Sequence, residues 1–159
     1  MKTTLTIQES AELIKRGVSA DKASAAVIYL NYADEEVEPY KIFKREGDGV
    51  LLTRLRNGAV IGVESKIVLK DSDSNYHVPI FTLADLFAIL PKGIIYNGLS
   101  CKLRITSWYD EPYFAGYENQ VGKYVMGNPY DAPFSAEELI DVIFQLLCWT
   151  IDNHHVKLD

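Results

Sequence analysis

Apolar residues recur at helical spacing in four segments of the chain, and each segment begins at a Ser or Thr. Three of these starts pair the hydroxyl with an acid three residues later, as a capping box does: Thr6 with Glu9, Thr82 with Asp85 and Ser135 with Glu138. The fourth start, Ser19, has no such acid. We expect helices at residues 7–16, 20–31, 83–90 and 136–153.

Two of these helices have marked ends, and the last one is unusually apolar. Gly17 can adopt the left-handed conformation that closes the first helix, and Pro91 ends the third near Leu90. In the fourth helix, apolar residues from Leu139 to Ile151 leave a narrow polar stripe. Such a helix needs cover on most of its sides. It lies either across a sheet and under other helices, or against a second copy of the chain.

Between the helical segments the apolar pattern changes to a period of two, which is typical of strands. The segments YKIFKRE, VLLTRLR and AVIGVESKIVLK follow one another, separated by Gly47-Asp48-Gly49 and Asn57-Gly58. Asn-Gly favours the positive φ angles of a tight hairpin turn, so we expect a three-stranded antiparallel meander at about 40–70. A further hairpin pairs LSCKLRITSW with PYFAGYEN around Asp110-Glu111-Pro112.

Antiparallel strands covered by about four helices define an α+β fold. A length of 159 residues suits one domain, long enough to bury roughly two thirds of the unfolded surface. We expect a single domain, residues 1–159, with sub-modules of about 1–75 and 76–159.

Three segments carry a resemblance to known proteins: LTIQESAELIKRGVSADKAS, FTLADLFAILPKGI and LIDVIFQLLCWTIDNHH. In these segments the chain resembles small uncharacterised proteins encoded by phages and mobile elements of gut Bacteroidetes. The shared motifs are helix caps, core positions and helix stops, over about half the chain. The resemblance implies a shared fold, and it implies no catalytic residues.

Charge and hydropathy narrow the class of partner. The formal net charge is −6, and residues 77–159 hold 5 Lys and Arg against 10 Asp and Glu, a net of −5. An acidic chain without a basic run argues against a nucleic-acid partner. The longest uncharged apolar run, residues 142–151, is short of the roughly 20 residues that cross a bilayer, and the start has no secretory signal pattern. We expect no membrane association and a cytoplasmic protein with reduced cysteines.

Catalytic and metal sites have weak candidates. His77 could meet the thiol of Cys101 or Cys148, but no serine is flanked by the glycines of a nucleophile elbow. His154 and His155 are adjacent, whereas helical metal ligands are three or four residues apart, so a helix end is favoured over a metal site. We expect no enzyme, no cofactor and no metal. An enzyme that uses these histidines remains an alternative.

Three further patterns have ordinary structural interpretations. Asp71 to Asn75 resembles half of a calcium loop, but the sixth position lacks Gly and the twelfth lacks Glu. Gly47-Asp48-Gly49 fits a hairpin turn better than a phosphate loop. Residues 7–31 could form a DNA-binding helix-turn-helix, although the second segment offers only Lys22 to base edges.

Tyrosines are concentrated in residues 96–134, together with glycines, prolines, Trp108 and Phe134. On strands such residues pack a half-buried face, whereas on loops they supply contact area at low entropic cost. Our preferred functional hypothesis is a partner-binding surface made of six residues: Trp108, Tyr109, Tyr113, Tyr117, Tyr124 and Tyr130. The protein would then be a non-enzymatic intracellular accessory protein of a phage or mobile element. Self-association through the helix at Leu139 to Ile151 is a separate possibility.

Overall fold

The computed structural model describes residues 1–30, 40–46, 49–56, 59–63, 67–68, 75–126 and 131–158. The elements follow in the order α1 (Ile7–Lys15), a 3₁₀ turn η1 (Ala20–Lys22), β1 (Ala25–Leu30), β2 (Tyr40–Glu46), β3 (Gly49–Arg56), β4 (Ala59–Val63), β5 (Ile67–Val68), β6 (Asn75–Ile80), α2 (Leu83–Ile89), β7 (Gly93–Tyr96), β8 (Leu99–Thr106), β9 (Tyr113–Glu118), β10 (Phe134–Ala136) and α3 (Leu139–Asp152). Helices with antiparallel sheets confirm the α+β class.

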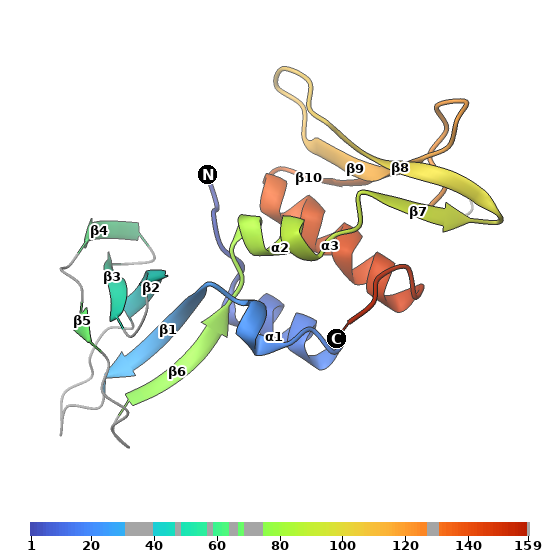
Figure 1. Cartoon of the computed structure of the whole chain (residues 1–159). Coiled ribbons are helices and arrows are strands. Elements are labelled where there is room, and N and C mark those ends of the chain that lie inside the picture. Colours follow the sequence, from blue (N-terminus) through green and yellow to red (C-terminus); the bar gives the residue numbers. More distant parts are fainter. Residues whose placement is uncertain are drawn as a thin grey trace.

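Helix α3 lies between two layers (Figure 1). A four-stranded antiparallel sheet in the order β10-β9-β8-β7 covers one side, and α1 and α2 lie on the other. The apolar positions of α3 are buried among these elements: Ile140, Val142, Ile143, Leu146, Leu147 and Ile151. Of the two arrangements that the sequence allowed, burial under a sheet and helices is therefore the one formed. None of the exposed large apolar side chains in the described part of the chain lies on α3.

The second sheet has the order β4-β3-β2-β1-β6, with β5 paired to β3. It contains an antiparallel meander of β2, β3 and β4, but the expected third strand is divided into β4 and β5, which both pair with β3. The meander is part of a larger sheet, since β1 and β6 extend it. Three sequence features lie wholly or mostly outside the described residues: the turn at 47–48, the Asn57-Gly58 turn and the calcium-like segment 71–75.

The expected helix at residues 20–31 is wrong. Ser19 caps only the short η1 turn, where its side chain accepts a hydrogen bond from the Asp21 amide. Ala25–Leu30 then forms β1, which pairs with β2 on one edge and β6 on the other. Strand pairing on both edges outweighs the helix propensity of the alanines, and the apolar run VIYL suits a strand. The helix-turn-helix interpretation of residues 7–31 needs a second helix, but this segment forms η1 and β1 instead.

The helix caps at Thr6 and Thr82 are confirmed. In both, the Thr side chain accepts from the backbone amide three residues on, and that residue's carboxylate accepts from the Thr amide. Helix α1 ends in a Schellman motif: the Gly17 amide donates to Ile14 O and the Val18 amide donates to Leu13 O. Gly17 has a φ of 102°, which favours glycine at this position.

The expected cap at Ser135 is wrong, and the last helix starts later than the pattern indicates. Ser135 lies in β10, opposite Phe114 of β9. Helix α3 begins after Glu138, which makes no side-chain cap. The Glu138 carboxylate instead accepts a hydrogen bond from the Lys2 amide at 3.0 Å. Contacts distant in sequence therefore replace the local cap.

The chain's first residues bind to the helices through Lys2. Its ammonium lies 2.9 Å from a Glu9 carboxylate oxygen and 2.5 Å from one of Asp141. Burial lowers the pKa of Lys2, but the hydrogen bonds to Asp141 and Glu9 outweigh it, so the pKa is raised. The Leu5 amide also donates to Phe81 O at 2.9 Å. These contacts attach the N-terminal segment to α1 and α3 through Lys2, and to the residue before the cap of α2 through Leu5.

The sequence interpretation missed the hairpin between β7 and β8. Its turn is Asn97-Gly98, with φ angles of 49° and 77°, as a type I′ turn requires. Ile94 of β7 faces Cys101 of β8, and both are buried in the core.

Candidate functional site

The connection between β8 and β9, residues 107–112, is called the hairpin tip here. In Figure 1 it extends beyond the sheet, away from α3. The Trp108 side chain is 69% exposed and Tyr109 is 96% exposed. The turn is closed by a hydrogen bond from the Glu111 amide to Trp108 O at 3.0 Å, with Asp110 in the left-handed region at a φ of 61°. Two neighbouring aromatic side chains are thus held in solvent by a closed turn.

The base of this hairpin is fixed in the core. Ile105 of β8 pairs with Ala115 of β9, and Ala115 is fully buried. On the other side of β9, Phe134 of β10 also pairs with Ala115. The tip therefore projects from a strand that has neighbours on both edges.

Tyr117, one of the six predicted partner-binding residues, is a core residue. Its side chain is 0% exposed, and its hydroxyl donates to Pro91 O at 2.7 Å. Burial raises the pKa of this phenol. Its ring lies 6.2 Å, centroid to centroid, from that of Trp149 on α3. The side chain offers no surface to a partner.

Tyr113 and Tyr124 are half-buried and pack against the core. Tyr124 lies over Gly116, where an added Cβ would be 2.8 Å from the tyrosine Cδ1. The segment that carries Tyr124 folds back along β9, since the Val125 amide donates to Tyr117 O at 2.9 Å. Tyr130 lies outside the described residues. Trp108 and Tyr109 are therefore the most accessible members of the described set.

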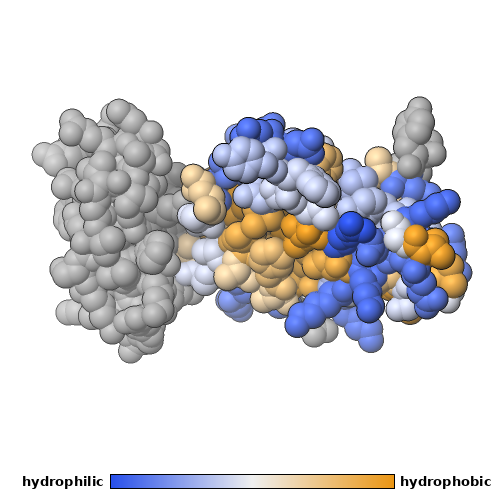
Figure 2. Space-filling model, turned by 90° about the horizontal axis from the view of Figure 1, so that it is seen from above, coloured by the Kyte–Doolittle hydropathy of each residue, from blue (hydrophilic) through white to orange (hydrophobic). Residues whose placement is uncertain are grey.

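The rest of the surface has scattered apolar side chains. Figure 2 shows one face, on which apolar surface gathers in the middle of the described part and again near the right-hand end. That end is where the β7–β8 hairpin lies in Figure 1, and Ile95 and Leu99 of this hairpin are exposed. These side chains are aliphatic, and the adjacent Tyr96 packs against the core, so they form a weaker candidate anchor than the tip.

The helix-end interpretation of the adjacent histidines is confirmed. Helix α3 has Asn153 as its C-cap, and His154 takes the left-handed position with a φ of 59°. The His154 amide donates to Ile151 O and the His155 amide to Thr150 O, which completes a Schellman motif. In the described ranges, no group of three or more His, Cys, Asp or Glu is placed to hold a metal ion.

His155 packs in a row of aromatic rings. Its ring centroid lies 5.1 Å from that of Trp149 and 6.3 Å from that of Tyr96. Burial, and then the neighbouring charge of His154, lower the pKa of His155. The neutral ring therefore fastens the C-terminal turn to α3 and β7.

Acidification is expected to destabilise the wild-type protein more than a His155→Phe variant. Because the folded-state pKa of His155 is lowered, its contribution is complete above the ordinary value of about 6.5 and declines as the pH falls toward the folded pKa. Chemical denaturation at about pH 7 and about pH 5 measures the difference. A Lys157→Gln variant is the control, because that side chain is exposed in the same C-terminal turn. Equal pH dependence in wild type and His155→Phe would contradict the prediction.

The candidate nucleophiles are not activated or brought together. Cys101 is buried in the core, and burial raises the pKa of the half-buried Cys148 thiol to about 11, so this thiol stays protonated at neutral pH. His77 lies on β6, where its backbone pairs with Ile28. Strand β6 and the sheet that holds Cys101 lie on opposite sides of α3 (Figure 1).

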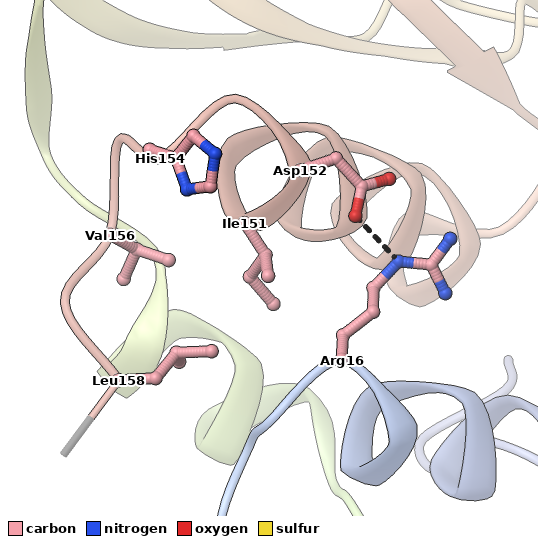
Figure 3. A pocket seen from close by; sticks show the side chains of 6 residues that line it. All are labelled: Arg16, Ile151, Asp152, His154, Val156 and Leu158. Atoms are coloured by element: carbon pink, nitrogen blue, oxygen red, sulfur yellow. Dashed lines mark hydrogen bonds and ion pairs between the residues drawn. The ribbon is translucent and has the colours of Figure 1, made fainter.

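A pocket of about 460 Å³ lies between the ends of α1 and α3 and the C-terminal turn (Figure 3). Its lining residues are Arg16, Ile151, Asp152, His154, Val156 and Leu158. Arg16 Nε donates to Asp152 Oδ1 at 3.0 Å, and Glu12 binds the same guanidinium. Because two carboxylates already bind this guanidinium, Arg16 is not available to an anionic ligand in the pocket.

The described helices are too short to cross a bilayer, the longest being the 14 residues of α3.

Comparison with protein-family models, with curated proteins and with solved structures gives no match to this chain.

Proposed function

We propose that this chain is a non-enzymatic binding protein that contacts a protein partner through the hairpin tip. Trp108 and Tyr109 are the anchors. The observation that carries the proposal is the exposure of these two adjacent rings, 69% and 96%, on a turn whose base is buried. We extend the proposal to an accessory role, inside the cell, for a phage or mobile element. This part of the proposal rests on the sequence resemblance alone.

Exposed aromatic rings are effective anchors for physical reasons. Trp and Tyr bury a large area and have a polar N–H or O–H that can find a partner in an interface. They have only two side-chain torsions, so little entropy is lost when they bind. Residues of these types supply a large share of the binding energy in measured protein interfaces. A tip that is already closed by a backbone hydrogen bond needs little further ordering.

A Trp108→Ala, Tyr109→Ala double variant is expected to keep its fold and lose its partner. Exposed side chains contribute within about 0.5 kcal/mol to stability, so the melting temperature should change by only a few degrees. Loss of two anchors should weaken the complex by tenfold or more, as for hot-spot residues worth about 1.4 kcal/mol or more. Quantitative mass spectrometry of proteins that co-purify with each variant from the native cells measures the loss.

The matched control is Val121→Ala, a change in a side chain that is 77% exposed on another turn. This variant should co-purify with the same proteins as the wild type. Undiminished co-purification with the double variant would contradict the proposal. A large fall in its melting temperature would show that the two rings have a structural role.

A further inference from the structure

The tip contains two carboxylates, and a third lies near its base. Asp110 and Glu111 lie within it, and both are exposed. Ala136 of β10 pairs with Tyr113 at the start of β9, so the next residue, the exposed Glu137, lies at the same end of the sheet. Two carboxylates thus adjoin the aromatic anchors in the turn, and a third lies at the end of the neighbouring strand β10.

These charges have no counter-ions in the described part of the chain. Asp110, Glu111 and Glu137 form no ion pair there. Residues 105–122 contain no Lys or Arg, and Arg104, which precedes them, is paired with Glu118. The tip end of the sheet is therefore acidic.

We infer that the partner presents a cationic protein segment to the tip, with an arginine side chain against the ring of Trp108 or Tyr109. This inference rests on the proposed function. A guanidinium is attracted to the face of an aromatic ring, and its planar N–H donors fit a carboxylate. Asp110 and Glu111 adjoin the rings in the sequence, so one segment can meet both kinds of group. Charge complementarity of this kind also speeds the encounter and excludes wrong partners.

Other occupants fit the tip less well. A neutral apolar groove would press against the carboxylates and remove water from them without supplying a positive charge, which is unfavourable. A nucleic acid would bring phosphates toward the same carboxylates, and these repel each other.

The inference is tested by nuclear magnetic resonance on the whole chain labelled with ¹⁵N. The chain has two tryptophans, Trp108 and Trp149, so it gives two indole N–H signals, which a Trp108→Phe variant assigns. The probes are short capped peptides of alternating Arg and Ser, Glu and Ser, or Leu and Ser, and an oligothymidine. The Arg peptide should shift the Trp108 signal in a saturable manner and leave that of Trp149 unchanged.

Two further results are expected. An Asp110→Asn, Glu111→Gln variant should bind the Arg peptide about tenfold more weakly, because both charges are lost. An Asp21→Asn variant, in an exposed acid on η1, should bind as the wild type does. Raising the salt concentration should weaken binding as well.

Three results would overturn the inference: no Trp108 shift with the Arg peptide, an equal shift with the Glu peptide, or a stronger shift with the Leu peptide or the oligothymidine. A stronger shift with the Leu peptide would leave the proposed function standing and change only the class of partner. Failure of the proposed function itself would instead appear as unchanged co-purification with the Trp108→Ala, Tyr109→Ala variant.

Discussion

Replacing Tyr117 with Ala is expected to lower the free energy of unfolding by about 3–5 kcal/mol, as for other large aromatic side chains removed from a core. The ring is 0% exposed and packs beside Trp149. Its loss leaves a cavity between β9 and α3. It also removes the hydroxyl that donates to Pro91 O. Urea or guanidinium denaturation of the purified variant measures the change.

A Tyr117→Phe variant separates the ring from its hydroxyl. It should lose about 1–2 kcal/mol, because the ring stays in place while the Pro91 carbonyl loses a donor. Tyr109→Ala is the matched control, since that ring is exposed, and it should change stability by about 0.5 kcal/mol or less. Equal stability of Tyr117→Ala and the wild type would contradict the burial of this ring.

A Leu146→Ala variant is expected to lose about 2–5 kcal/mol of stability. Leu146 is fully buried in the middle of α3, under the sheet and over the other helices. Because this burial occurs within one chain, the loss should be the same at low and high protein concentration. Denaturation curves at two concentrations about a hundredfold apart test this point.

The control for this variant is Gln145→Ala, one residue earlier on the exposed face of α3, which should have little effect. A different result would show that a second copy covers α3. In that case the wild-type stability would rise with protein concentration, and on dilution it would fall to that of Leu146→Ala.

Local sequence signals predicted the helices that begin at a complete capping box. Thr6 with Glu9 and Thr82 with Asp85 close their own first turns, so the helix starts depend on neighbouring residues alone. Gly17 likewise ends α1 by its backbone conformation. The β8–β9 hairpin was also predicted, since its turn and alternating strands are continuous in sequence.

Features that depend on distant residues were predicted poorly. The strand Ala25–Leu30 is formed by pairing with β6, about 50 residues further along the chain. Ser135 has the sequence of a helix cap, but pairing with β9 places it in a strand. The missed β7–β8 hairpin is different, because it does not depend on distant residues. Its turn, Asn97-Gly98, carries the same local signal as Asn57-Gly58.

The candidate site was predicted in part. Trp108 and Tyr109 are exposed because they belong to the turn and not to the strands. Alternation along β9 contained the signal that Tyr117 is a core residue, since Tyr113, Ala115 and Tyr117 share one face while the charged Glu118 belongs to the other. The acidic surroundings of the tip include Glu137, which only the pairing of β10 with β9 brings near.

The most direct test of partner binding through the tip is photo-crosslinking in the native cells. A photoreactive phenylalanine derivative is placed at position 109 in one variant and at position 121 in another, both exposed turn positions. We expect a discrete crosslinked protein from position 109, none from position 121, and a crosslinked segment of that protein that carries arginine. A crosslink from position 121 with none from position 109 would contradict partner binding through Trp108 and Tyr109.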